Sequence, residues 1–311
     1  MTPSRPQALA IKCTRVVPNI HRACGQPLRA RYGEIVPAGA AIDSMGPCNG
    51  QPAPKNEGHP VLHRLLPPPI IEVDPDAAYR ADRHPVAGRP WLMMNMISSL
   101  DGAVEVDGVS GPLGGPGDRE IFGAIRSIPD IIMAGATTVA AERYNPPSTS
   151  VSARVRRLAN GAWPTARIAV VSRSLGFDLS IPMFGEASGD QRPLVITIDE
   201  PPADRLAAVS KLADVIHAGP ESVDMGQAMA ALGELGAKVV LAEGGPTLNA
   251  QLLAADLVDE ICMSVAPLAA AGIGNRIAHG PAPDAPTEFD LCQVLVEDHY
   301  LFLRYVRDGV I

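Results

Sequence analysis

One segment of the sequence has the residue types of a turn that binds a diphosphate: Glu243-Gly244-Gly245-Pro246-Thr247-Leu248. Its two glycines have no side chains, so a ligand can approach the backbone closely. A helix that begins after them would also present free N–H groups and the positive end of its dipole. A glycine pair between a strand and a helix is also an ordinary tight turn. The sequence therefore predicts a cofactor contact at this turn, and the plain turn stays open as the alternative.

A second cluster, Ser172-Arg173-Ser174, combines one guanidinium with two hydroxyls. These groups could hold the 2′-phosphate of NADPH, which would favour NADPH over NADH. A solvated turn is the alternative interpretation. The dinucleotide fingerprint G-x-G-x-x-G and the phosphate-loop pattern G-x-x-x-x-G-K-[ST] are both absent, so neither a standard Rossmann half nor a phosphate-loop NTPase is indicated.

Both clusters follow short apolar runs that predict buried strands of about five residues. Helical patterns lie between these strands, and the alternation predicts an α/β fold with a mostly parallel sheet covered by helices on both faces. The last two apolar runs predict an antiparallel hairpin at the C-terminal end. The predicted strands are 90–97, 130–134, 167–171, 193–198, 214–217, 238–242, 257–266, 291–296 and 300–306, and the predicted helices are 117–127, 202–212 and 222–235, the last capped by Ser222 with Leu235 facing inward.

In such a sheet, ligands bind beyond the carboxyl ends of the strands. The junctions after the strands carry small or hydrogen-bonding residues, among them Asp101 in Ser98-Ser99-Leu100-Asp101-Gly102 and Thr138 in Gly135-Ala136-Thr137-Thr138-Val139. Asp101-Gly102 is also compatible with a plain turn. We expect these junctions to meet at one rim of the sheet.

Taken together, these segments resemble the pyrimidine reductase domain of riboflavin biosynthesis. The resemblance covers residues 89–307 in order, and it rests on the segments 98–102, 110–111, 125–126, 130–139, 243–248 and 257–260. It implies a dihydrofolate-reductase-like fold, NADPH as the cofactor, a homodimer, and reduction of 5-amino-6-(5-phosphoribosylamino)uracil to the ribitylamino compound.

The resemblance also implies roles for individual residues. Thr138, Ser172 and the turn Gly245 to Leu248 would contact NADPH, whereas Ser110, Arg126 and Glu243 would face the substrate. The implied reaction delivers a hydride to the sugar carbon of a ring-opened imine and a proton to its nitrogen. Asp101 and Glu243 are the candidate proton donors, and water is a third source.

Two departures from the family pattern limit this transfer. Bifunctional members carry a zinc deaminase with H-x-E and P-C-x-x-C patterns, which are absent here, so we expect neither deaminase activity nor a metal site. The usual Asp-Asp-Pro after the Thr-Val pair is replaced by Glu142-Arg143-Tyr144. Glu142 can replace a carboxylate in a cofactor contact, but the usual arginine for the ribose phosphate has no clear equivalent. A dihydrofolate or dihydropterin reductase and a non-catalytic dinucleotide-binding protein therefore remain alternatives.

The composition excludes several other classes of protein. No run of 18 uninterrupted apolar residues predicts a membrane span, and five scattered cysteines without C-x-x-C spacing argue against a disulfide framework or a zinc site. We expect a cytoplasmic enzyme that acts on a small molecule and binds neither membranes nor nucleic acid.

The first 69 residues differ from the rest of the chain. They hold 12 of the 31 prolines and have eight Lys/Arg against three Asp/Glu, a net charge of +5, which leaves −13 for the remainder of the chain with its total of −8. They show no hydrophobic period, and their arginines are scattered rather than blocked, which disfavours a nucleic-acid tail. Their prolines also disfavour an organelle transit peptide. We therefore predict a disordered extension over residues 1–69 and a reductase domain over residues 70–311.

Overall fold

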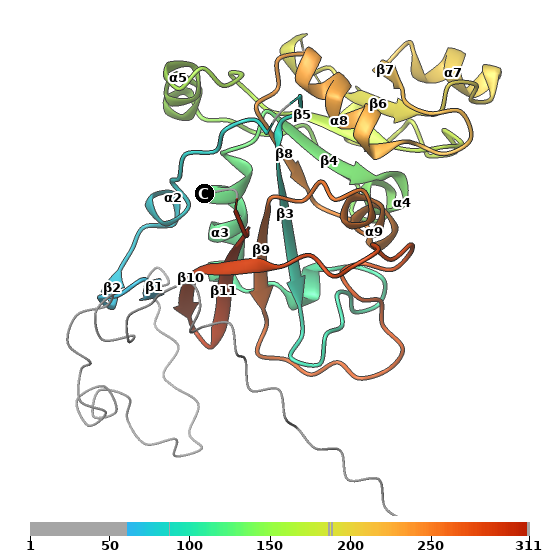
Figure 1. Ribbon diagram of the computed structural model, residues 1–311. Coiled ribbons are helices and arrows are strands. Elements are labelled where there is room, and N and C mark those ends of the chain that lie inside the picture. The colour runs from blue at the N-terminus through green and yellow to red at the C-terminus, as the bar shows by residue number, and fades with distance from the viewer. Residues whose placement is uncertain (1–60, 87, 186, 188, 310–311) are drawn as a thin grey trace, which may run out of the picture. The chain divides into compact units, whose positions relative to one another are not determined.

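In the computed structural model, residues 61–86, 88–185, 187 and 189–309 are described (Figure 1). Strands and helices alternate along most of this part of the chain, as the apolar runs predict. In chain order the elements are β1 (His63–Leu66), β2 (Ile71–Glu72), α2 (Pro75–Ala78), β3 (Trp91–Ser98), α3 (Pro116–Arg126), β4 (Ile131–Gly135), α4 (Ala136–Ala141), α5 (Val151–Ala159), β5 (Arg167–Val171), α6 (Pro182–Gly185), β6 (Leu194–Thr197), α7 (Ala203–Val209), β7 (Asp214–His217), α8 (Met225–Glu234), β8 (Val239–Ala242), α9 (Pro246–Ala254), β9 (Glu260–Val265), β10 (Phe289–Glu297) and β11 (Tyr300–Arg307). Two 3₁₀ turns, Gly111–Leu113 and Gly189–Gln191, complete the set of elements in the described residues.

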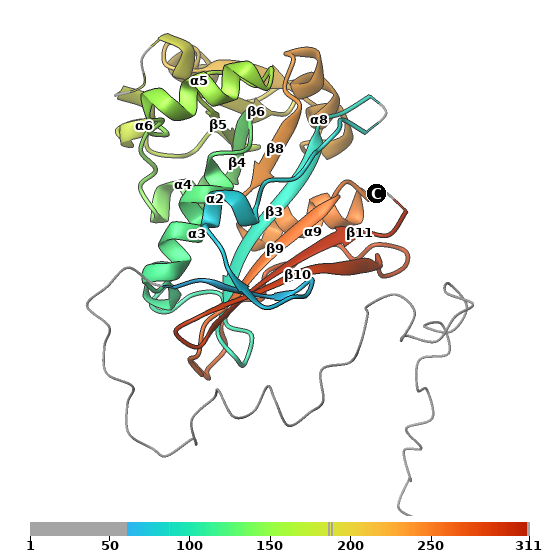
Figure 2. The same cartoon turned by 90° about the vertical axis from the view of Figure 1, so that its left-hand side faces the viewer.

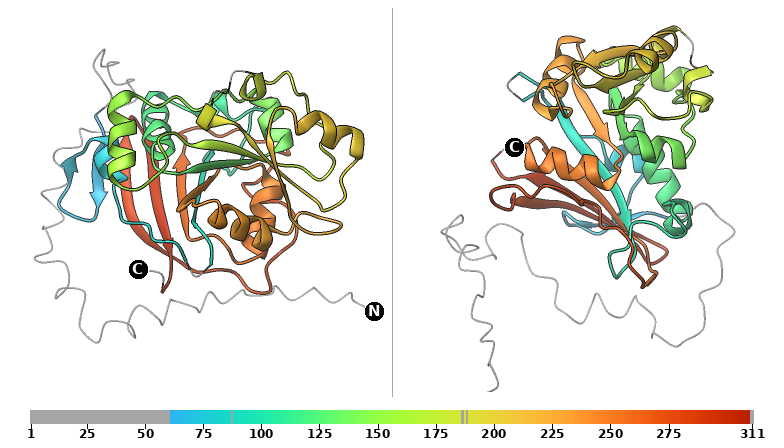
Figure 3. Two further views of the ribbon diagram at one scale, coloured as in Figure 1. Left: turned by 90° about the horizontal axis from the view of Figure 1, so that it is seen from above. Right: turned by 90° about the vertical axis from the view of Figure 1, so that its right-hand side faces the viewer.

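The strands form one sheet in the order β2-β1-β10-β11-β9-β3-β8-β4-β5-β6-β7. Neighbours from β9 to β7 run parallel, whereas β2, β1, β10, β11 and β9 pair antiparallel. The right-hand view of Figure 3 shows β10 and β11 at one end of the sheet and the yellow strands β6 and β7 at the other. The predicted fold class, a mostly parallel sheet with a C-terminal antiparallel hairpin, is confirmed.

Apolar residues on both faces of the central strands explain why helices cover both sides. On β3, Trp91 and Met93 join one buried cluster, whereas Leu92 and Met94 join the other. The first cluster includes side chains from α3, α4 and α7, and the second includes side chains from α8 and α9. Figure 2 shows α3 and α4 on one side of β3 and α9 on the other.

Two details of the predicted elements are wrong. Asp224, not Ser222, caps α8, because its carboxylate accepts a hydrogen bond from the backbone N–H of Gln227 at 3.0 Å. Leu235, predicted to face inward, follows the last residue of α8 and is 47% exposed.

The hairpin after β10 turns through Asp298 and His299, both with positive φ, which is the geometry of a type I′ turn.

The folded domain also begins earlier than predicted. β1 pairs with β10, and Leu62 beside it is only 4% exposed within the first buried cluster. The segment 61–66 lies between Pro60 and Pro67 and carries no hydrophobic period, so composition alone could not separate β1 from the extension. The boundary at residue 69 is therefore wrong for residues 61–69, and residues 1–60 lie outside the described part of the chain. Among the helices described, none has the length and apolarity needed to cross a membrane.

Candidate active site

The turn after β8 is held against the end of β4 by two backbone hydrogen bonds. Glu243 N–H donates to the Met133 carbonyl at 2.9 Å, and Gly135 N–H donates to the Gly244 carbonyl at 2.8 Å. Gly244 has a φ of +92°, which favours glycine, and a Cβ on Gly245 would lie 2.7 Å from the Thr138 Oγ1. The backbone of this turn therefore lies directly against the start of α4, where the φ of Gly244 favours glycine and a side chain at Gly245 would displace the Thr138 hydroxyl.

Two helices begin at this junction. α4 starts after Gly135 and α9 starts after Gly245, and neither of these N-cap glycines offers a side chain that could accept a hydrogen bond. The N–H groups in the first turn of the longer helix, α9, are thus available to an anion. Thr138 lies in the first turn of α4 and is half-buried, whereas in α9 Pro246 is half-buried and Thr247 is exposed. The side chain of Leu248 is 4% exposed in the core, so only its backbone is placed for a cofactor contact.

The two predicted substrate residues Arg126 and Glu243 form a bidentate ion pair. Arg126 Nε donates to Glu243 Oε1 and Arg126 Nη2 donates to Oε2, both at 2.6 Å. The Glu243 side chain is 4% exposed and that of Arg126 is 28% exposed. The guanidinium lies 4.4 Å from the ring centre of Phe122 and 5.3 Å from that of Tyr144. Burial alone would lower the pKa of Arg126, but the hydrogen bonds and charge of Glu243 outweigh it and raise that pKa.

Tyr144 completes this cluster and was not predicted. Its hydroxyl donates to Glu243 Oε2 at 2.7 Å. Burial, followed by the negative charge of Glu243, raises the pKa of Tyr144 well above its ordinary value, so the phenol stays protonated. The only signal in the sequence was its place in the segment that departs from the family pattern, just after Glu142.

Two further predicted residues, Ser110 and Glu142, also meet. Glu142 Oε1 accepts hydrogen bonds from the Ser110 N–H and from the Ser110 hydroxyl, both at 3.0 Å. Ser110 lies between β3 and α3, and Glu142 follows the last residue of α4. The predicted substrate-side and cofactor-side residues are thus joined at the rim of the sheet.

Asp101 lies in the turn after β3 and is exposed. Its carboxylate accepts hydrogen bonds from the Ser99 hydroxyl at 2.5 Å and from the backbone N–H groups of Ala270 and Ala271 at 3.0 and 2.6 Å. These hydrogen bonds, the one from Ser99 above all, lower the pKa of Asp101 to about 2. At neutral pH, Asp101 is therefore an ionised acceptor.

The cluster at the end of β5 is only partly available to a ligand. The Ser172 hydroxyl accepts a hydrogen bond from Leu175 N–H at 3.1 Å and its residue is 8% exposed, whereas Arg173 is exposed. Ser174 accepts a hydrogen bond from Gly176 N–H at 3.3 Å, so two hydroxyls shape the turn that presents Arg173. β5 is the neighbour of β4, which places this turn along the same edge of the sheet.

One further hollow lies away from this rim. A hollow of about 500 Å³ lies at the opposite end of α9, lined in part by Ala254, Asp256 and Arg307, and it contains none of the predicted site residues. Within the described residues, no group of three or more His, Cys, Asp or Glu side chains could hold a metal ion.

A model of the RibD C-terminal domain family matches residues 90–296. The chain belongs to this family. The predicted family resemblance is therefore confirmed, and the matched region contains every predicted site residue. Both of the turns that approach each other at Gly135 and Gly244 lie in the RibD C-terminal domain.

Relatives of known name agree with this membership. The chain is 31% identical over 189 residues to a protein of Methanothermobacter thermautotrophicus. The matched region covers 60% of this chain and 82% of that protein. It is 29% identical over 205 residues to a protein of Archaeoglobus fulgidus, with coverages of 65% and 87%. Both relatives are named 2,5-diamino-6-ribosylamino-4(3H)-pyrimidinone 5′-phosphate reductase.

A solved structure supports the same fold. A pyrimidine reductase-like protein from Corynebacterium diphtheriae superposes with a TM-score of 0.67 at 26% identity, covering 76% of this chain and 99% of that one.

Proposed function

We propose that this RibD C-terminal domain protein is a NADPH-dependent reductase of a 5′-phosphoribosylamino pyrimidine. The observation that carries the proposal is the meeting of Arg126 and Glu243 at the same edge of the sheet as the glycine turn. This edge is where ligands bind in parallel α/β sheets. The names of the two relatives at 29 and 31% identity support the same substrate class.

The residues at the glycine turn fit a dinucleotide. Gly245 lets the backbone of the turn approach Thr138 closely, and the uncapped start of α9 offers N–H donors for the diphosphate. Arg173 would contact the 2′-phosphate, because it is exposed on the turn after the neighbouring strand β5. When bound, the cofactor supplies the hydride.

The side chains on the substrate side would orient the open-chain sugar and the ring. Glu243 accepts hydrogen bonds from Arg126 and Tyr144, and Arg126 keeps Nη1 free of this pair, so a phosphate or ring oxygen could accept a hydrogen bond from it. Asp101 is unsuited to donate a proton, because its pKa is lowered to about 2. We therefore assign the proton on the product nitrogen to water, with Glu243 as an acceptor that orients the substrate.

Turnover assays with defined pyrimidines test the proposal. Loss of NADPH absorbance is followed with the diaminopyrimidinone and the deaminated uracil, each with and without its 5′-phosphate, and with dihydrofolate. We expect turnover of the phosphorylated pyrimidines, with a ribitylamino product identified by mass, and weaker activity on the compounds without phosphate. The relatives' names favour the diaminopyrimidinone, so the ratio of kcat/KM for the two ring forms decides between it and the predicted uracil.

The assay also separates the alternatives. Turnover of dihydrofolate without turnover of either pyrimidine would reject the pyrimidine assignment and leave a pterin reductase. NADPH binding without any turnover would leave a dinucleotide-binding protein on the same fold.

A further inference from the structure

The connection from β9 to β10 passes two turns of the proposed site. Its first part, residues 266–280, starts at the carboxyl end of β9, which pairs with β3, and β3 in turn pairs with β8. Leu100 N–H donates to the Leu268 carbonyl at 2.7 Å, and Val104 N–H donates to the Asn275 carbonyl at 3.3 Å. The loop is therefore fastened along the turn that follows β3.

Asp101 is the side chain that fastens the first half of this loop. Its two carboxylate oxygens accept the N–H groups of Ala270 and Ala271, and its Oδ1 also accepts the Ser99 hydroxyl, which in turn accepts the Ala103 N–H at 2.9 Å. Hydrogen bonds to an ionised acceptor are roughly twice as strong as neutral ones. The carboxylate thus links the loop to the turn in which it lies.

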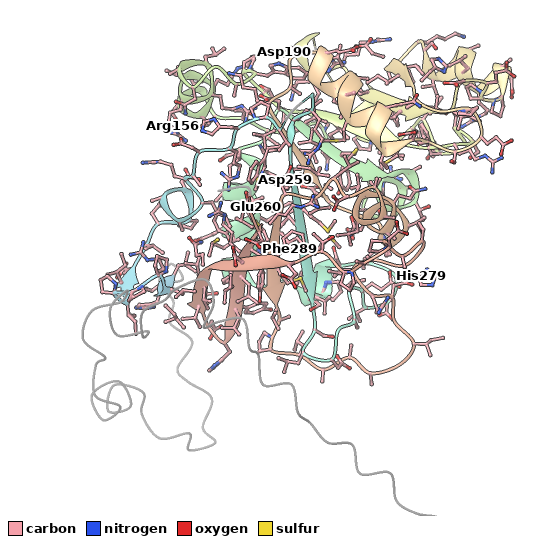
Figure 4. All side chains as sticks on the ribbon, in the orientation of Figure 1. Arg156, Asp190, Asp259, Glu260, His279 and Phe289 are labelled. Carbon is pink, nitrogen blue, oxygen red and sulfur yellow. The ribbon has the colours of Figure 1, made fainter. Side chains whose placement is uncertain are left out.

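Asn249 fastens the second half of the loop to α9. Asn249 is fully buried, and its Nδ2 donates to the Ile277 carbonyl at 2.6 Å. Nearby, His279 N–H donates to the Pro246 carbonyl at 3.0 Å, at the first residue of α9. A Cβ on Gly280 would lie 3.0 Å from the Ala250 Cβ, so the backbone packs closely on the helix. Figure 4 labels His279 at this end of the loop.

We propose that residues 266–280 form a wall of the reaction site and that Asp101 and Asn249 are positioning residues that hold it. The proposal rests on the proposed function, because it places the wall between the turn after β3 and the glycine turn that would receive the dinucleotide. Asp101 acts on the substrate through the loop and neither donates nor accepts a proton in the reaction. Asn249 sets the loop at the start of the helix that presents N–H groups to the cofactor.

Tryptic cleavage after Arg276 measures the loop without reference to activity. Arg276 is the single Lys or Arg between residues 266 and 288, and it is exposed. Loss of the Asp101 hydrogen bonds should raise the population of the open loop, so Asp101→Ala should speed this cleavage about tenfold, and Asp101→Asn should speed it less. Asn249→Ala gives the same readout from the other end of the loop.

Steady-state kinetics measure the consequence for the site. Asp101→Ala should raise KM for the phosphoribosylamino pyrimidine about tenfold while kcat changes by less than about twofold, because lost positioning weakens binding rather than chemistry. Asn249→Ala should mainly weaken NADPH binding, measured as Kd. Asp224→Ala is the matched control: it removes a capping carboxylate from α8, away from the loop, and should leave cleavage after Arg276 and both affinities unchanged.

Three results would overturn the proposal. Unchanged cleavage after Arg276 in Asp101→Ala would show that the carboxylate does not hold the loop. Faster cleavage with unchanged KM and Kd would show that the loop is not a wall of the site. A fall in kcat at constant KM would make Asp101 a catalytic group. If the parent protein turns over no pyrimidine, the proposed function fails, and the cleavage rates together with the NADPH Kd still decide the positioning role.

Discussion

Glu243 is a buried carboxylate that is paired with one guanidinium and accepts a hydrogen bond from one phenol. The family resemblance implied separate substrate-side roles for Arg126 and Glu243, and the structure makes them one bidentate pair. The pair is neutral, so it cannot by itself offset the charge of a phosphate. We propose that its contribution to substrate binding lies in the remaining donors of Arg126 and in the fixed direction of the guanidinium, which is stacked on Phe122.

Arg126→Ala should therefore have two effects. It should raise KM for the phosphorylated pyrimidine about tenfold or more, through loss of the hydrogen-bond donor that Arg126 keeps free of Glu243. It should also lower the free energy of unfolding by up to about 3 kcal/mol, because Glu243 would remain buried without its partner. Urea unfolding and steady-state kinetics measure the two effects, and NADPH affinity should remain nearly intact.

The double variant Arg126→Ala with Glu243→Gln separates the two effects. It removes the unpaired charge, so stability should recover in part while KM stays high. A KM that recovers along with stability would show that Arg126 acts only on the fold.

Arg173→Ala should change cofactor preference. A hydrogen bond to a charged group contributes about 1.5 to 3 kcal/mol, so the Kd for NADPH should rise roughly 10 to 150-fold while the Kd for NADH hardly changes. Calorimetric titration with both cofactors measures this, and Arg154→Ala, an exposed arginine paired with Asp190, is the control. Equal affinities of the parent protein for NADPH and NADH would contradict the assignment to the 2′-phosphate.

At the scale of elements, the buried strands were the most predictable part of the fold. Each central strand buries both faces, so its sequence is a continuous apolar run with few alternatives. The glycine turn was predictable because a turn with positive φ at Gly244 and a close contact with Thr138 at Gly245 favours glycine at both positions. Tyr144 and Asn249 were not predictable, because their partners lie far away in sequence or on an irregular loop, and neither residue type indicates such a contact.

The strand β1 offers a prediction about the N-terminal boundary. Burying a leucine contributes about 1.5 to 3 kcal/mol, and 1 kcal/mol shifts Tm by roughly 2 to 4 °C in a domain of this size, so removing Leu62 and β1 should lower Tm by about 5 to 10 °C. Deletion of residues 1–69 should therefore destabilise the domain, whereas deletion of residues 1–60 should not, since their proline-rich composition predicts little buried area. Calorimetric melting of both variants measures this. Equal Tm values for the two deletions would show that β1 contributes nothing to stability.

At the scale of the whole domain, one buried carboxylate links segments that are distant in the chain. Glu260 on β9 accepts hydrogen bonds from Arg83 Nε at 2.7 Å and Nη2 at 2.8 Å, from Arg304 Nε on β11 at 2.7 Å, and from Trp91 Nε1 on β3 at 3.1 Å. Arg83 lies between α2 and β3, so this contact fastens the N-terminal segment to the sheet. Figure 4 labels Glu260 beside Asp259, which pairs with Arg89 from the same segment.

The Glu260 cluster predicts how the free energy of unfolding of the domain falls at acid pH. Burial raises the pKa of Glu260, but hydrogen bonds and charges from Arg83 and Arg304 outweigh it and lower the pKa from 4.5 to about 2. A carboxyl group whose pKa is lowered by folding stabilises the fold at pH values above its pKa in the unfolded chain. This stabilisation is lost as the pH falls toward its pKa in the folded protein. Between about pH 6 and 3.5, this group alone should therefore remove about 1.5 kcal/mol from the free energy of unfolding.

The variant Glu260→Gln isolates that contribution. It should be less stable than the parent at neutral pH, because Arg83 and Arg304 lose their counter-charge. The difference between the two proteins should then shrink as pH falls, since Glu260 of the unfolded parent binds a proton in this range while Glu260 of the folded parent stays ionised. Urea unfolding of the parent, Glu260→Gln and the exposed control Glu221→Gln across this pH range measures it. A difference that stays constant down to about pH 3.5 would mean that Glu260 keeps an ordinary pKa in the fold, and the ion cluster would then contribute no pH dependence to stability.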